Sequence, residues 1–430
     1  MITLIAFLVV LLSGLPIFSA LLFAAVAFMF EFDLTFLFEN TLPDQLYGAL
    51  NKNGLLAIPL FMLVGELMNR GGLTEKLIMA AEVLVGRIKG GLAYVNLLTN
   101  AMASSILGSA TAQISIMSST MIPEMVQRGY RKDFSAAVTM AGGLLGPIFP
   151  PSMIMIIYGV IAYQPISSLF LAGILPGVFI VFLFALLIFI IGCFTELPRG
   201  DKIGFKEAIK RLANAILPGL IPIAVIMLIL LGVTTPTEAG AIASLIAFIL
   251  GAFIYKNIGI KDIGPILLNV GNSTATITIL IASATVLGWA LGFEGIPDMI
   301  IGALIGLTDS SFWFLMLVYA VVILLGMFLE SISVMIVLLP ILIPALGAYG
   351  IDPIHFGVMV TVATVIGVVT PPVGAGLFIT MQNTRLKMSQ VFYAFIPFLG
   401  ILFVGMIVIA LWPELSLWLP EVSKTWGGGK

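Results

Sequence analysis

The sequence has 430 residues, of which 60% are hydrophobic and only 9% are charged. Soluble domains carry about 25% charged residues, so this composition predicts an all-α integral membrane protein and excludes a soluble enzyme. The net charge of −2 gives no indication of nucleic-acid binding. The single Cys193 excludes a disulfide framework and a cysteine metal cluster, and the single His355 lies in a predicted loop.

Apolar stretches predict about nine membrane crossings. They lie at residues 2–30, 54–69, 134–162, 169–194, 213–232, 238–255, 272–292, 355–384 and 391–412. Gly14 and Pro16 predict a bend in the first of these. Residues 73–88 alternate apolar and charged positions with helical spacing, which predicts an amphipathic helix at the membrane surface. The most basic loop, residues 195–212, divides the chain into two halves.

Two other apolar stretches are interrupted by small or polar residues, and both predict re-entrant helical hairpins. Residues 91–125 are interrupted at 104–111 and have basic residues at both ends, so a helix that enters and returns keeps these charges on one side. Residues 311–347 are interrupted at 326–333 and are flanked by Asp309 and Asp352, which predicts entry from the opposite side. This topology leaves all but three of the 19 Lys and Arg residues in the cytoplasm. The exceptions are Lys52, Lys424 and Lys430.

Two predicted spans contain a Pro-Pro pair and form part of an internal repeat. Gly146 precedes Pro150-Pro151, and 221 residues later Gly367 precedes Pro371-Pro372. Pro123, Gly129 and Pro176 recur at the same offset as Pro344, Gly350 and Pro397. We therefore predict an inverted-topology repeat of residues 45–190 and 266–411. Proline lacks an N–H, so each pair predicts a broken helix, and two broken helices at corresponding positions indicate a transporter binding site.

Each half thus places a hairpin tip beside a helix break, where free carbonyls suit a small cation. We predict one sodium site in each half, formed by tip hydroxyls and by carbonyls near the break. The first set contains Ser105, Ser109, Gly146, Phe149 and Pro150. The second set contains Gly326, Ser331, Ser333, Gly367 and Thr370. The alternative is that the prolines only kink packed helices.

Polar residues near the tips and just beyond the breaks are candidates for substrate binding. They are Thr111, Gln113, Glu330, Thr380 and Gln382. Polar packing within the bundle is an equal explanation for the neutral ones. Glu330 is the most unusual, because a carboxylate at a re-entrant tip is costly unless it has a function. It could ligate a cation, carry a proton or cap a helix N-terminus.

Several motifs resemble the large membrane subunit (the M subunit, DctM-like) of tripartite ATP-independent periplasmic (TRAP) transporters. They are Gly108-Ser109-Ala110-Thr111-Ala112, Arg128-Gly129-Tyr130, Gly146-Pro147-Ile148, Gly350-Ile351-Asp352-Pro353 and Thr370-Pro371-Pro372-Val373-Gly374. The resemblance covers nearly the whole chain and departs at Glu330, where aspartate is more usual. It implies sodium-coupled import of an organic acid across the bacterial inner membrane. Its implied partners are a periplasmic substrate-binding protein and a small membrane subunit with four spans, with no cofactor besides Na⁺.

The resemblance also implies an elevator-type transporter, in which a transport domain slides against a scaffold. Residues 1–90 would form scaffold helices and an interfacial arm, and 91–165 the first part of the transport domain. Residues 166–310 would return to the scaffold, 311–385 would complete the transport domain, and 386–430 would form the last span and tail.

The implied substrate is sialic acid, or otherwise a C4-dicarboxylate. A stand-alone sodium–dicarboxylate symporter, needing no binding protein, remains the alternative, and an ion channel is a further one. The sequence has no HExxH or GxSxG motif and no paired intramembrane carboxylates, so we do not expect an enzyme.

Overall fold

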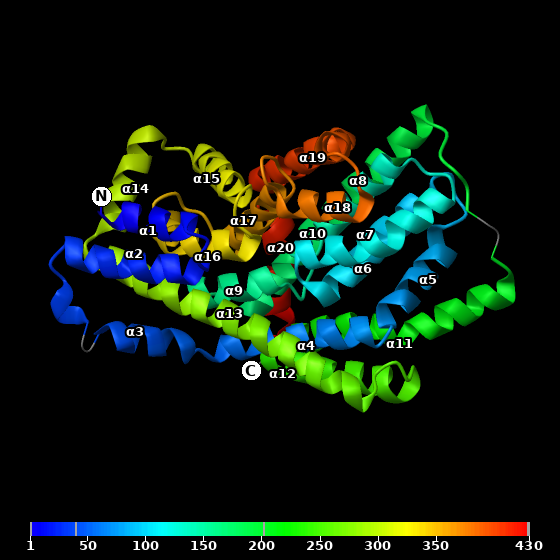
Figure 1. Cartoon of the computed structure of the whole chain (residues 1–430), viewed down its shortest axis with the longest axis horizontal. Coiled ribbons are helices and arrows are strands. Elements are labelled where there is room, and N and C mark those ends of the chain that lie inside the picture. The colour runs from blue at the N-terminus through cyan, green and yellow to red at the C-terminus, as the bar shows by residue number, and fades with distance from the viewer. Residues whose placement is uncertain (1, 39–40, 201–202, 428–430) are drawn as a thin grey trace.

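The computed structural model describes residues 2–38, 41–200 and 203–427, and its regular structure there is helical (Figure 1). The first half contains α1 Ile2–Leu12, α2 Ile17–Glu31, α3 Thr41–Leu50, α4 Ala57–Arg70, α5 Leu73–Val85, α6 Gly91–Leu107, α7 Ala110–Gln127, α8 Lys132–Gly143, α9 Met153–Ala162 and α10 Ile166–Phe194. The second contains α11 Phe205–Leu230, α12 Pro236–Ile249, α13 Ile260–Phe293, α14 Ile296–Leu307, α15 Ser311–Gly326, α16 Ser331–Leu342, α17 Pro353–Val368, α18 Ala375–Thr384, α19 Met388–Leu411 and α20 Glu414–Gly427.

The elements of the predicted repeat occur in the same order in both halves, with α6 to α10 corresponding to α15 to α19. Helices α7 and α16 begin 221 residues apart, at Ala110 and Ser331. Helices α8 and α17 begin at Lys132 and Pro353, again 221 residues apart. The repeat predicted from single prolines and glycines therefore extends to the boundaries of whole helices.

The expectation of one bent span over residues 2–30 is wrong. Gly14 has a φ of +81°, which glycine adopts without strain, and Pro16 follows it. The chain reverses there, and α1 packs along α2, so that the backbone N–H and Oγ1 of Thr3 both donate to Glu31 Oε2, at 3.0 and 2.8 Å. Helices of 11 and 15 residues are about 16 and 22 Å long, too short to cross a bilayer alone.

Other boundaries also shift. The predicted loop 195–212 ends early, because α11 begins at Phe205 and already carries Lys206, Lys210 and Arg211. The predicted span 272–292 is the C-terminal part of α13, which has 34 residues and a length of about 51 Å. Within the described ranges, five helices have the length and apolarity to cross a membrane, and up to seven spans result if two bent pairs each count as one. The nine crossings remain a prediction.

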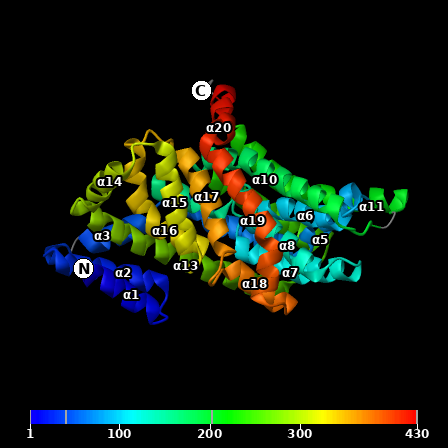
Figure 2. The same cartoon turned by 90° about the horizontal axis from the view of Figure 1, so that it is seen from above.

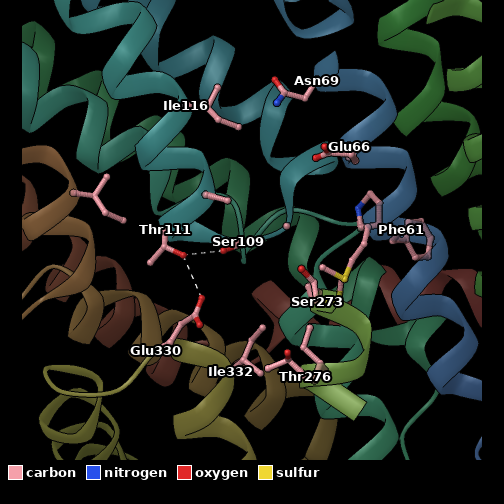
Figure 3. Close-up of a pocket in the computed structure, with 18 residues that line it drawn as sticks. Phe61, Glu66, Asn69, Ser109, Thr111, Ile116, Ser273, Thr276, Glu330 and Ile332 are labelled. Atoms are coloured by element: carbon pink, nitrogen blue, oxygen red, sulfur yellow. Dashed lines mark hydrogen bonds between the residues drawn. The ribbon is translucent and has the colours of Figure 1, made fainter. Parts of the chain in front are cut away.

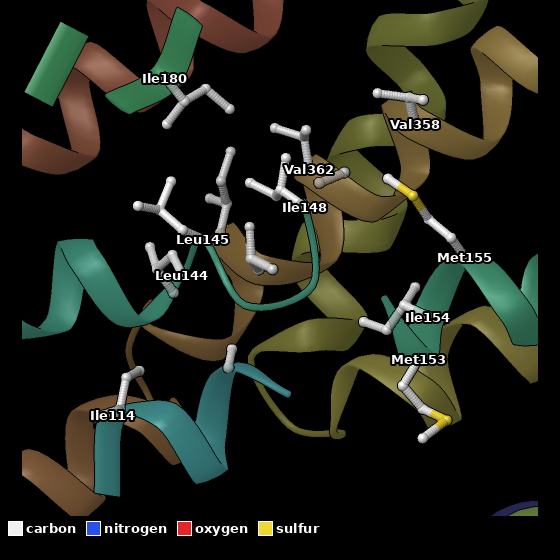
Figure 4. Close-up of a cluster of buried hydrophobic side chains, with 14 of the residues drawn as sticks. Ile114, Leu144, Leu145, Ile148, Met153, Ile154, Met155, Ile180, Val358 and Val362 are labelled. Carbon is white, nitrogen blue, oxygen red and sulfur yellow. The ribbon is translucent and has the colours of Figure 1, made fainter. Parts of the chain in front are cut away.

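The core forms where elements of both halves interlock. Helix α7 packs against α18 of the other half, and α16 packs against α9. Every residue of α17 from His355 to Val368 is buried, as is α8 from Ser135 to Gly143. Apolar side chains of the first break, such as Ile148 and Met155, meet Val358 and Val362 of α17 there (Figure 4). The N-terminal segments of both broken helices are therefore shielded by protein.

The remaining helices surround this core. The long α13 runs beneath it, with α4 and α12 packed together beside it (Figures 1 and 2). Helices α4 and α13 also contact each other, and α13 contacts α16. One surface of the hairpin region consequently faces α4 and α13, and the candidate site lies on that surface.

Candidate functional site

Each hairpin tip lies directly on the helix break of its own half. At the first tip, a Cβ added to Gly108 would lie 3.2 Å from the backbone nitrogen of Met153 and 3.7 Å from the carbonyl oxygen of Pro151. At the second, the N–H of Gly374 donates to the carbonyl of Met327 at 3.1 Å. Both Pro-Pro bonds, Pro150-Pro151 and Pro371-Pro372, are cis. The structure thus brings tip and break together twice.

The two tips also contact each other across the centre. Thr111 Oγ1 donates to Glu330 Oε1 at 3.2 Å, and Ser109 Oγ lies 3.1 Å from Thr111 Oγ1 (Figure 3). Ser109 and Glu330 are the N-cap residues of α7 and α16, and neither side chain caps its own helix. The carboxylate of Glu330 instead points across to the first hairpin. Glu330 could ligate a cation, carry a proton or cap a helix. The structure shows no capping hydrogen bond from its side chain to α16.

A cavity of about 600 Å³ opens between the tips and the helices α4 and α13 (Figure 3). Its polar groups come from both sides, and its other walls are mostly apolar. The polar residues are Glu66, Asn69, Ser109, Thr111, Ser273, Thr276 and Glu330. The apolar residues include Phe61, Met62, Ile116, Met153, Ile277, Ile332 and Ile379. A few polar groups in an apolar cavity of this size are typical of a small-molecule site.

The two carboxylates of the cavity differ in their surroundings. Glu66 Oε1 accepts hydrogen bonds from Arg70 Nε at 2.7 Å and from Asn269 Nδ2 at 3.2 Å. Glu330 is exposed, and no ion pair involving it is found among the described residues. The positive charge of Arg70 therefore balances Glu66, whereas Glu330 contributes an unbalanced negative charge.

The first predicted sodium set is partly assembled. A Cβ on Gly146 would lie 3.1 Å from the carbonyl oxygen of Ser109, so the tip carbonyl approaches the break closely. Among the described groups, no donor bonds to the carbonyls of Gly146 or Phe149. Pro150 supplies no N–H to Gly146, as expected from its position. The side chain of Ser105 lies outside the described part of the chain.

Gln113 belongs to this region rather than to the cavity. It is fully buried, and its Nε2 donates to the backbone O and to Oδ1 of Asn100, at 2.7 and 2.9 Å. Asn100 bonds in turn to Asn96, which donates to Thr139 Oγ1 at 2.6 Å. Gln113 Oε1 has no hydrogen-bond partner among the described residues, and a Cβ on Gly146 would lie only 2.7 Å from it. A buried amide oxygen without a donor is the chemistry that a cation ligand needs.

The second predicted set is brought together only in part. Gly326 and Gly367 lie back to back, so that a Cβ on Gly367 would be 2.6 Å from the Cα of Gly326. Thr370 lies beyond them, with Oγ1 bonded to the carbonyl of Ile366. Ser331 is buried and its Oγ lacks a partner among the described residues, while Ser333 is buried two residues further along α16. A close glycine contact and an unpartnered buried oxygen occur in each half, with Gln113 Oε1 in the first and Ser331 Oγ in the second. The two sodium sites stay predictions.

The predicted substrate residues divide into two groups. Thr111 and Glu330 line the cavity. Thr380 is buried and bonds to the carbonyl of Gly376, and Gln382 is exposed outside the cavity lining. Sequence reasoning missed Ser273 and Thr276, two hydroxyls on α13 whose position in an apolar span was an available signal. Glu66, in the predicted span 54–69, is not among the predicted site residues either, and the structure places it in the cavity wall.

The chain is similar to known proteins over most of its length. Residues 4–415 match the family described as the DctM component of the tripartite ATP-independent periplasmic transporters. The chain therefore belongs to this family of transporter subunits. It is 34% identical to the sialic acid TRAP transporter large permease protein SiaM of Vibrio cholerae, over 96% of this chain and 97% of that one. It is 32% identical to the C4-dicarboxylate large permease DctM of the same organism, over 86% of each chain.

Solved structures with a similar fold are also transporters. The YdaH transporter of Alcanivorax borkumensis aligns with a TM-score of 0.61 at 16% identity, covering 89% of this chain and 88% of its own. MtrF of Neisseria gonorrhoeae aligns with a TM-score of 0.59 at 14% identity, covering 89% and 85%. Together with the apolar helices, the family membership identifies an integral protein of the bacterial inner membrane.

Proposed function

We propose that this chain is the large membrane subunit of a sodium-coupled tripartite transporter that imports an organic acid. The substrate is of the sialic acid or C4-dicarboxylate type that names the similar permeases. The observation that carries the proposal is the cavity between the two hairpin tips and α4 and α13, which has proposed sodium ligands directly beside it. Coupling follows from this arrangement, because Ser109 belongs both to the cavity lining and to the first cation set.

Bound sodium would supply positive charge at the tips. Around it, the carbonyls of Ser109 and Gly146 and the amide oxygen of Gln113 would form the first site, where Gln113 is fully buried. Ser331 and Thr370 would contribute to the second site, where Gly326 and Gly367 let two backbones approach. Occupation of these sites would hold each tip against its break, which fixes Thr111 and Glu330 in the cavity wall.

An elevator movement is consistent with where the cavity lies. One wall belongs to the hairpins and broken helices, which we assign to a transport domain of residues 91–165 and 311–385. The other wall belongs to α4 and α13, which we assign to the scaffold. The cavity extends to Glu66 and Asn69, close to Arg70 on the predicted cytoplasmic side. This state would release substrate inward.

The partners follow from the tripartite family. A periplasmic binding protein would deliver the substrate, and a small membrane subunit, with four spans, would support the scaffold. A stand-alone symporter is not favoured, because the similar curated proteins are permease subunits of TRAP transporters.

The test is uptake of labelled organic acid into proteoliposomes that contain this chain and its small subunit. Uptake is measured with and without the binding protein, under an inward sodium gradient. We expect uptake only when both are present, and its loss when potassium replaces sodium. Uptake that needs no binding protein would support the stand-alone symporter, and uptake indifferent to sodium would refute the coupling.

A further inference from the structure

The charge of the cavity restricts which organic acids fit. No lysine, arginine or histidine is found among the residues that line it within the described ranges. The guanidinium of Arg70 stands behind Glu66 and is engaged with it at 2.7 Å. The net charge contributed by the walls is therefore negative and comes from Glu330. This is an unexpected environment for a substrate that is itself an anion.

The carboxylate of Glu330 has unused hydrogen-bonding capacity. A carboxylate accepts about four hydrogen bonds, and Glu330 receives one from Thr111 through Oε1. It makes no capping bond to α16. Glu330 thus offers a charged acceptor to whatever occupies the space between the hairpin tips.

A second group at the same place lacks a partner. Ser331 follows Glu330 directly, is only 4% exposed, and its Oγ has no hydrogen bond. It lines a small recess between the tips, together with Thr111 and Glu330. A buried hydroxyl without a partner is costly unless a ligand satisfies it. The recess holds only about 10 Å³, which admits one small ion or polar atom, so Ser331 stays with the second cation set and Glu330 is the group that faces the substrate cavity.

We infer that Glu330 determines specificity by accepting a hydrogen bond from a hydroxyl, amide or ammonium group of the substrate and by repelling a second carboxylate. The chain then carries organic acids with one carboxylate and a donor group, and excludes dicarboxylates. This inference rests on the proposed function. The substrate carboxylate lies away from Glu330, where Ser273 and Asn69 provide donors.

The size and composition of the cavity agree with such a substrate. A volume of about 600 Å³ lies within the range that encloses drug-sized ligands and is larger than a four-carbon diacid requires. Phe61, Ile116 and Ile277 provide apolar surface between the polar groups. An acid with a carbon skeleton between its carboxylate and its donor group would contact the donor residues, the apolar surface and Glu330 at the same time.

The experiment compares two small acids of matched size. Succinate has two carboxylates, and succinamate replaces one of them by an amide that donates hydrogen bonds. Their affinities for the purified complex of this chain with its small subunit are measured in nanodiscs by thermal stabilisation in sodium, with sialic acid as a larger monocarboxylate probe. We expect the wild-type complex to bind succinamate at least about tenfold more tightly than succinate. The amide of succinamate donates a hydrogen bond to the Glu330 carboxylate, whereas the second carboxylate of succinate cannot donate and is repelled by it.

Variants separate the role of Glu330 from general damage. Glu330→Gln is expected to bring the two affinities within about twofold of each other, whereas Glu330→Asp keeps the charge and the preference. Glu75→Gln is the matched control, because Glu75 is exposed on α5 outside the cavity lining. It is expected to leave both affinities unchanged.

Two results would overturn the inference. One is a wild-type complex that binds succinate as tightly as succinamate or more tightly. The other is a Glu330→Gln complex that still binds succinamate with the original preference. In either case sodium-driven uptake in proteoliposomes can persist, so the proposed function would stand. Absence of both binding and uptake would instead refute the proposed function, and the inference with it.

Discussion

The contact between Gly326 and Gly367 gives the sharpest test of the second cation site. In Gly367→Ala the added Cβ lies 2.6 Å from the Cα of Gly326 and 2.9 Å from the carbonyl oxygen of Ile323. Carbon atoms pack at about 3.5–4.0 Å, so the hairpin backbone must move by about 1 Å. Neither neighbouring atom belongs to a flexible side chain, so the tip itself must shift away from the break.

The expected effect is much larger on sodium binding than on folding. Overpacking of this kind costs about 1–3 kcal/mol, which a large membrane protein can tolerate. A displacement of about 1 Å at a preorganised site weakens function about a hundredfold. At a sodium concentration 100 times the wild-type Kd, binding stabilises the protein by about 2.7 kcal/mol, and a hundredfold weaker Kd removes most of that.

The assay is a sodium titration of thermal stability and of uptake, with Gly400→Ala as the matched control. Gly400 lies in α19 of the same half, and a Cβ there meets no atom within 4 Å. The control is expected to keep the wild-type titration, with a small gain from helix propensity. If Gly367→Ala also keeps that titration, the reasoning about the second site is wrong.

Further predictions address both cation sites, the topology and the movement. Ser331→Ala is expected to weaken sodium dependence about tenfold with little loss of stability in its absence, since its Oγ has no protein partner; an unchanged titration would exclude it as a ligand. Gln113→Leu should likewise weaken sodium-dependent stabilisation by about 1–3 kcal/mol, measured by thermal unfolding, and an unchanged stabilisation would exclude Gln113 as a ligand of the first site. In a Cys193→Ser background, membrane-impermeant labelling should distinguish a cysteine beside Arg128 from one beside Asp352, and equal labelling would contradict the inverted topology. A cross-link between α4 and α9 should abolish uptake, and full uptake with the cross-link in place would argue against an elevator movement.

Much of the fold was predictable because its signals are local. A proline removes one hydrogen bond wherever it lies, so the breaks at Pro150 and Pro371 could be located without any knowledge of the packing. The repeat offset likewise located α16 and α17 from α7 and α8. The reversal at Gly14 was missed because a glycine next to a proline predicts a bend, while its angle depends on whether α1 finds a packing surface on α2.

The candidate site, like the fold, has features that were predictable from the sequence and features that were not. Sequence alone determined the membrane class, the repeated breaks and the polar character of the tips, since these follow from composition and from chain-local hydrogen bonding. Only the tertiary structure decided which polar groups meet. It moved Gln113 from the cavity to a buried network with Asn100, placed Glu66 in the cavity wall, and joined Thr111 to Glu330 across 219 residues. Such pairings depend on how two hairpins pack against opposite halves of the chain. A local sequence pattern does not determine which residues so far apart in the chain come into contact.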